Sequence, residues 1–112
     1  MSTPRPQPGP GVDAVFGALA DPTRRRLIET LSASPHATPT SLAGELPITR
    51  QAVAKHLATL SGAGLVRRTR AGRETRYELE PEALGEAAAW IAAVGSEWED
   101  RLGGLQRLIA RR

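Results

Sequence analysis

A dense group of arginines in the middle of the chain carries the side chains best suited to bind phosphate. Five arginines lie within residues 67–76, with Glu74 as their one acidic neighbour. A guanidinium group is planar and always charged, and its fork of donors fits a phosphate or the edge of a guanine. So many positive charges repel one another unless an anion lies nearby. The group consists of Arg67, Arg68, Arg70, Arg73 and Arg76.

These arginines fall in a stretch with the signals of a β-hairpin. Strands are expected over residues 65–70 and 73–79, joined through Ala71-Gly72. Tyr77 and Leu79 share one face and should anchor this hairpin, the wing, to a core. The alternative to a binding role is that the arginines protect the exposed edges of the hairpin from aggregation.

Alternation along the strands means that the wing arginines cannot all face one partner. We expect Arg70 and Arg73, which flank the turn, to contact the partner directly, followed by Arg68. For Arg76, contact with the partner and bracing of the hairpin through a carboxylate are equal alternatives.

A second set of polar side chains falls on one face of a helix expected from Thr49 to about Ser61. Val53, Leu57 and Leu60 recur at i, i+4 and i+7, which predicts a buried stripe. The opposite, exposed face of this candidate recognition helix then carries Arg50, Gln51, Ala54, Lys55 and Ala58.

That exposed face has the groups needed to read base edges. Gln51 can pair with adenine and Arg50 or Lys55 with guanine, and each bidentate contact is worth roughly 1–3 kcal/mol of discrimination. Ala54 offers a small surface to a thymine methyl group, and the cap hydroxyl of Thr49 with the first free amides suits a phosphate. An ordinary solvated helix face is the alternative.

His56 borders the buried stripe of the same helix. Contact with a phosphate and packing at a helix junction are both consistent with this position. The sequence leaves the two roles open.

The elements that position these groups are mostly helices. Pro4, Pro6, Pro8 and Pro10 predict a disordered or extended tail over residues 1–11. A helical pattern begins at Val12, and further helices are expected after Asp21-Pro22 and after Thr38-Pro39. A winged helix-turn-helix domain is therefore expected over residues 12–80, with a mainly α fold and one small β-hairpin.

The terminal helix, expected from about Glu82 within residues 81–112, carries a double seven-residue repeat of the kind that pairs helices. Packing on its own domain alone is the alternative. Gly103-Gly104 is expected to kink or fray the helix. The first repeat is Leu84, Ile91, Trp98 and Leu105, and the second is Ala88, Gly95, Leu102 and Ile109. The interface of the expected homodimer comprises Val15, Phe16, Leu84, Ile91, Trp98, Leu102 and Leu105.

Composition narrows the possible classes of function. Residues 1–79 hold 11 basic and 6 acidic side chains, whereas residues 80–112 hold 4 and 6, so the positive charge lies with the winged domain. The chain has no cysteine, which excludes disulfides and thiolate metal sites. It shows no signal peptide or apolar membrane span, so residence in the cytoplasm is expected. No pattern of catalytic residues appears, so we expect no enzyme.

Several short segments together resemble the bacterial ArsR-type winged-helix repressors, over about residues 12–110. This resemblance implies a homodimer that binds a palindromic operator in double-stranded DNA, usually near its own promoter, and blocks transcription. The segments are Ala20-Asp21-Pro22-Thr23-Arg24, residues 53–57, Ala63-Gly64-Leu65-Val66, and Gly72-Arg73 with Tyr77.

The chain departs from the metal-sensing members of that family. Those members carry paired cysteines near the start of the recognition helix, or His and Asp ligands on the terminal helix. The matching segment here, residues 45–49, has no thiol, and the terminal helix has no histidine. His36 and His56 are the only imidazoles in the sequence, which makes a poor closed site. We therefore expect the non-metal branch, with no cofactor and no metal; whether an unknown small-molecule effector exists stays open.

A winged-helix module that binds RNA or another protein is the alternative function. The basic wing would suit RNA as well as DNA. An RNA binder would not need Gln51 and Lys55 to face outward together.

Overall fold

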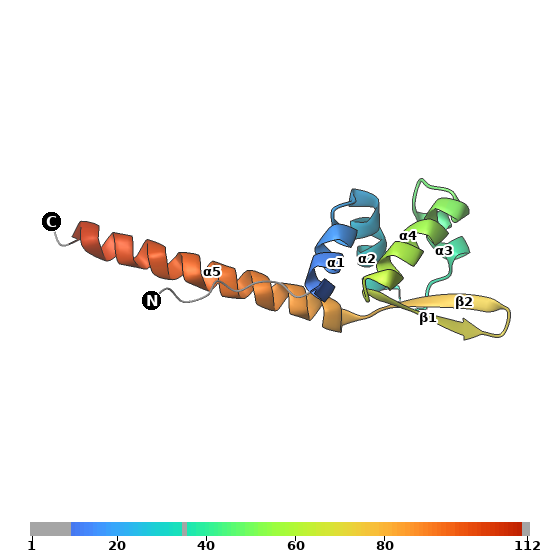
Figure 1. Ribbon diagram of the computed structural model, residues 1–112. Coiled ribbons are helices and arrows are strands. Elements are labelled where there is room, and N and C mark those ends of the chain that lie inside the picture. Colours follow the sequence, from blue (N-terminus) through green and yellow to red (C-terminus); the bar gives the residue numbers. More distant parts are fainter. Residues whose placement is uncertain (1–9, 35, 111–112) are drawn as a thin grey trace.

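The computed structural model describes residues 10–34 and 36–110, which form a winged domain and a long projecting helix (Figure 1). The described part of the chain is mainly α-helical with one antiparallel hairpin, as the sequence predicts. The elements are α1 (Pro10–Leu19), α2 (Pro22–Ala33), α3 (Pro39–Glu45), α4 (Arg50–Gly62), β1 (Val66–Ala71), β2 (Glu74–Leu79) and α5 (Pro81–Ala110).

Side-chain caps set where three of the helices begin. The Asp21 carboxylate accepts hydrogen bonds from the amides of Thr23 (2.7 Å) and Arg24 (3.2 Å) at the start of α2. Thr38 forms a capping box with Ser41 at the start of α3. The Thr49 hydroxyl accepts from the amide of Ala52 (3.1 Å) and so begins α4. All three boundaries agree with the positions expected from the sequence.

The Asp21 cap should make the free energy of unfolding depend on pH in acid. Desolvation raises the pKa of Asp21, but the amide hydrogen bonds and the charges of Arg24 and His56 outweigh it, so the pKa lies below its ordinary value of 3.8. The folded state therefore binds fewer protons than the unfolded state. The stability from this carboxylate is complete above its ordinary pKa and is lost as the pH falls through the lowered pKa.

We therefore expect Asp21→Asn, which keeps a capping side chain, to flatten the acid limb of the stability profile. The free energy of unfolding, measured by urea between pH 7 and pH 3 at one protein concentration, should differ most from the parent above the ordinary pKa of Asp21. Asp13→Asn, at an exposed position of α1, controls for the loss of one negative charge. A difference that does not change with pH would contradict the prediction.

A single core holds the winged domain together. It collects one face of each of the first four helices, the base of the hairpin and the start of α5. The side chains without any exposed surface are Leu27, Leu42, Val53, Leu57, Leu60 and Leu65.

Three features of α1 and α5 differ from the expectations based on the sequence. The first helix begins at Pro10 rather than Val12, because proline suits the first helical position; residues 1–9 of the expected tail lie outside the described residues. Helix α5 continues through Gly103-Gly104 to Ala110. Val15, which we placed in a dimer interface, is 1% exposed and belongs to the core of its own domain.

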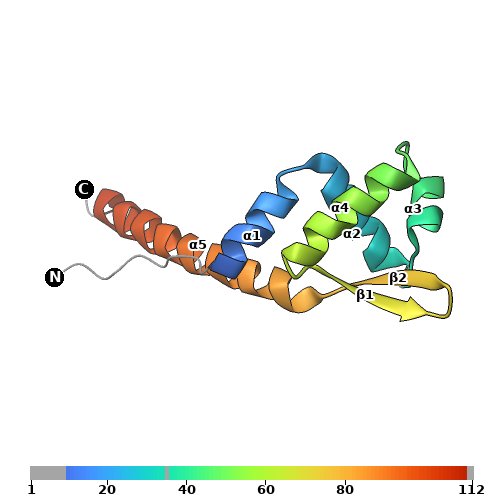
Figure 2. The same ribbon diagram turned by 45° about the vertical axis from the view of Figure 1, so that its right-hand side comes forward.

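Helix α5 leaves the winged domain on the side opposite the wing, as both views show (Figure 2). Its first turns pack on α1, where the rings of Phe16 and Trp90 meet edge to face with centroids 5.5 Å apart. The molecule therefore extends 69 Å along its longest axis.

Arg24 and Arg25 of α2 hold the end of α1, although the periodicity of α2 places them partly outward. The Arg24 guanidinium donates to the carbonyls of Ala18 and Gly17, and Arg25 donates to the carbonyl of Leu19 (2.6 Å). The last carbonyls of a helix have no partner within it, so these arginines satisfy them. They are structural side chains in this fold.

Candidate nucleic-acid interface

The outward face of α4 carries the donors that the sequence predicts. Arg50, Gln51, Ala54 and Lys55 are exposed, while Val53 and its neighbours on the other face are buried. Within residues 10–34 and 36–110, no hydrogen bond or ion pair engages the side chains of Arg50, Gln51 or Lys55. These long donors are therefore available to a partner.

His56 lies on the inner side of α4. Its side chain is half-buried, and it is close enough to Asp21 for its charge to lower the pKa of that carboxyl group. Of the two roles that the sequence left open, this position favours packing at the junction with α2.

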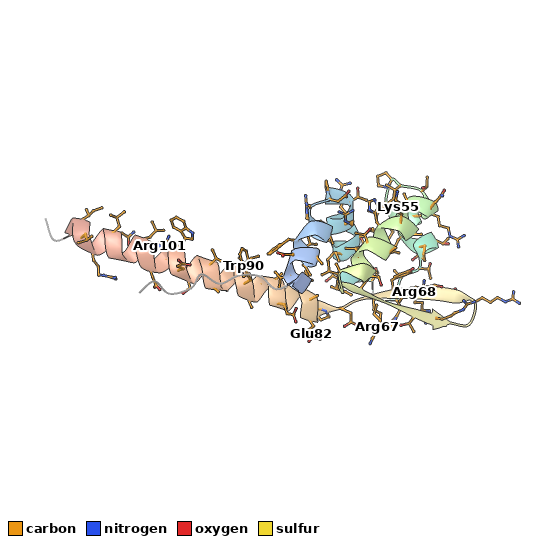
Figure 3. All side chains as sticks on the ribbon, viewed as in Figure 1. Lys55, Arg67, Arg68, Glu82, Trp90 and Arg101 are labelled. Atoms are coloured by element: carbon orange, nitrogen blue, oxygen red, sulfur yellow. The ribbon has the colours of Figure 1, made fainter. Side chains whose placement is uncertain are left out.

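The pairing of the two strands assigns the wing arginines to two faces. Arg68 pairs with Tyr77 and Arg70 with Thr75, whereas Arg67 pairs with Glu78. Since Tyr77 is buried against the helices, Arg68 and Arg70 lie on the inner face of the wing and Arg67 on its outer face. Figure 3 shows Arg67 and Arg68 on opposite sides of the hairpin.

On the outer face of the wing, near its base, Arg67 forms ion pairs with two carboxylates. Arg67 lies 2.9 Å from Glu78 and 3.2 Å from Glu80. The hydrogen bond from Arg67, helped by the charge of His36, lowers the pKa of Glu78 against the effect of desolvation. His36 Nδ1 is itself 2.7 Å from Glu78. This network braces the wing, and the residue pattern of the strands alone does not predict it.

Arg76 also follows the bracing alternative. It lies on the outer face with Arg67, and its guanidinium is 3.5 Å from Glu74. Its position is therefore less suited to binding a phosphate than that of Arg68.

The turn of the wing lies one residue later than expected. Ala71 pairs with Glu74, so Gly72 and Arg73 form the two-residue loop. Gly72 has φ 65°, the positive angle that the first position of a type II′ turn needs. Arg73 thus lies at the tip of the wing itself, and Arg70, whose Nε is 3.4 Å from the carbonyl of Gly72, lies beside it.

A groove of about 550 Å³ separates the wing from the start of α3 and α4. Its wing side carries Arg68, Thr75 and Tyr77, and its helix side carries Thr40 and Arg50. The threonines could not be predicted from the sequence, because a hydroxyl on a strand or helix gives no signal until the elements are brought together. The remaining lining residues are Thr38, Pro39, Ser41, Arg73 and Glu74.

The far part of α5 exposes a continuous apolar face. Leu84 packs against the core, and Ile91, Trp98 and Leu105 follow at seven-residue intervals on the same side of the helix. The Arg101 guanidinium stacks over the Trp98 ring, 5.3 Å from its centroid. Six large side chains on this part of the helix, Ile91, Trp98, Leu102, Leu105, Leu108 and Ile109, are 54–64% exposed.

The side chains and helices of the described residues bear on two further kinds of partner, metal ions and membranes. No group of three or more His, Cys, Asp or Glu side chains among them could hold a metal ion. None of their helices is both long and apolar enough to cross a membrane.

Comparison with known proteins decides the family. A helix-turn-helix domain family matches residues 19–69. The HTH-type transcriptional regulator Rv2034 of Mycobacterium tuberculosis is 39% identical over 97 residues, covering 87% of this chain and 87% of that protein. An ArsR-like transcriptional regulator from Rhodococcus sp. RHA1 has a TM-score of 0.77 at 37% identity, covering 88% of this chain and 92% of that one. The chain belongs to the ArsR family.

This ArsR-family chain is a DNA-binding transcriptional regulator and not an enzyme, as the sequence predicts. Another relative, the HTH-type transcriptional regulator CmtR of Mycobacterium tuberculosis, is 42% identical over 84 residues, covering 71% of this chain and 70% of that protein. Its NMR structure, described as a cadmium metal sensor, has a TM-score of 0.54 at 36% identity and covers 76% of this chain and 80% of that one.

Proposed function

We propose that this ArsR-family regulator is a homodimeric repressor of a palindromic operator. In this proposal the two copies of α4 enter successive major grooves, and each wing contacts the neighbouring backbone or minor groove. The observation that carries the proposal is the outward face of α4, where Arg50, Gln51 and Lys55 have no partner among the described residues. The repressor would act on chromosomal DNA in the cytoplasm.

A second copy of the chain is the proposed cover for the apolar face of α5. Monomeric proteins rarely leave so large an apolar patch in water. Phe16 and Leu84, half-buried at the junction of α1 and α5, would lie at the edge of this interface. A twofold pair can present two recognition helices about 34 Å apart, one turn of DNA, which a single domain cannot do.

The experiment is an electrophoretic mobility shift on DNA from upstream of the protein's own gene. Unlabelled specific DNA should compete, whereas unrelated DNA and RNA should compete poorly at physiological salt. In vitro transcription from the same fragment should fall as protein is added, which tests repression and autoregulation. Equal competition by RNA would favour the RNA-binding alternative.

Gln51→Ala tests base reading by α4. We expect it to weaken binding to the operator by about 5- to 150-fold, the range for one bidentate contact, while binding to unrelated DNA changes little. The measurement is the ratio of the two dissociation constants at fixed salt. Ala58→Gln, which adds an amide farther along the exposed face, is a control for a change in polarity. Equal loss on all sequences would remove Gln51 from base recognition.

A further inference from the structure

We propose that the groove between the wing and the helix-turn-helix binds one phosphate of the operator backbone in each half-site. This inference rests on the proposed function. It assigns to the groove a ligand, a single phosphodiester, and to its lining residues a role in fixing the wing relative to α4 on the duplex.

The position of the groove follows from the shape of the duplex. Adjacent major and minor grooves of DNA are separated by one sugar–phosphate backbone. If α4 occupies the major groove and the wing lies over the adjacent minor groove, that backbone must pass between them. The groove lies between these elements, with Arg50 on the side of α4 and Arg68 on the side of the wing.

The charge of the groove suits an anion. Three arginines line it, Arg50, Arg68 and Arg73, against one carboxylate, Glu74. That carboxylate lies 3.5 Å from Arg76, which partly neutralises it. The side chains of Arg50, Arg68 and Arg73 have no ion pair or hydrogen bond within the described ranges 10–34 and 36–110.

Hydroxyl groups add donors to the floor and walls. Those of Thr38 and Ser41 are used in the capping box of α3. Those of Thr75 and Tyr77 bond to no described residue, and among the described residues no side-chain oxygen is both sealed from solvent and unpartnered. The Tyr77 ring is thus buried while its hydroxyl stays open to a ligand, so that a phosphate would meet charged and neutral donors together.

The test compares an arginine of the groove with an exposed arginine elsewhere on the winged domain. Arg68→Gln and Arg26→Gln each remove one positive charge, but only Arg68 lines the groove, and Arg26 of α2 forms no ion pair with a described residue. We expect Arg68→Gln to weaken operator binding about tenfold and to reduce the slope of log affinity against log salt by about 0.9. Arg26→Gln should change affinity less than about threefold, and Tyr77→Phe, which keeps the buried ring, should weaken binding measurably without lowering the melting temperature.

A scan of the operator with single neutral methylphosphonates locates the phosphate. One position in each half-site should weaken the parent protein about tenfold and cost the Arg68→Gln protein little more, because that contact is already lost. Equal losses for the two arginine variants, or a scan that affects both proteins alike at every position, would overturn the groove inference while leaving the proposed function intact. A parent protein without any preference for an upstream fragment would instead refute the proposed function.

Discussion

Trp98→Asp is expected to yield monomers and to weaken operator binding by about two to four orders of magnitude. In the proposed dimer, Trp98 lies in the middle of the exposed apolar face of α5. A carboxylate at this position would be buried in the interface with no positive charge to pair with, which is energetically costly. In a dimer, binding of the first recognition helix holds the second one close to its own half-site, which raises the overall affinity by about 10²–10⁴. This gain is lost once the copies separate. Light scattering measures the mass, and a mobility shift measures the affinity.

Ser96→Asp is the matched control for this prediction. Ser96 is exposed and lies two residues before Trp98, so it faces the opposite side of α5. The same charge added there should leave both dimer and affinity unchanged. A Trp98→Asp protein that still dimerises and binds the operator would show that α5 pairs through another face, or that the dimer forms elsewhere.

The sequence predicted those parts of the fold that depend on local chemistry. Asp21, Thr38 and Thr49 are caps whose side chains bond to amides two or three residues away, so their effect can be read from neighbouring positions. The buried stripe of α4 is equally local, because helical spacing alone places Val53 and Leu57 together. The exposed donors of α4 followed from that stripe.

Contacts between distant segments could not be predicted in the same way. Arg24 bonds to carbonyls of α1 because of the angle at which α1 and α2 meet, and periodicity carries no information on that angle. The repeat in α5 likewise does not say which part its own domain covers. Helix α1 has 10 residues and α5 has 30. At about 1.5 Å per residue, α1 can cover only about a third of α5, which leaves Trp98 exposed.

The faces of the wing arginines could not be predicted from the sequence, because the register of the two strands was unknown. The residues that alternate along each strand were known, and Tyr77 was expected in the core. Only the register, with Arg68 opposite Tyr77, places Arg68 in the groove and Arg67 against carboxylates. That register depends on the residue that takes the positive φ at the turn, which is Gly72 in the first rather than the second loop position.

Leu57→Ala is expected to lower the free energy of unfolding by about 2–5 kcal/mol, a large part of the roughly 5–15 kcal/mol of a typical domain. Leu57 has no exposed surface and anchors the middle of α4 to the core, so its loss leaves a cavity behind the helix that presents Gln51 and Lys55. Urea denaturation at one protein concentration measures the loss, because the stability of a dimer depends on concentration.

Leu57→Met separates packing from DNA contact, since it nearly conserves volume and should cost less than about 1.5 kcal/mol. At a temperature where the Leu57→Ala protein is still folded, both variants should bind the operator almost as tightly as the parent, because this side chain points away from the proposed DNA surface. A stable Leu57→Ala protein with impaired binding would reverse the assignment of the two faces of α4. Stability and recognition should therefore separate within one helix, with the inner stripe controlling the first and the outer donors the second.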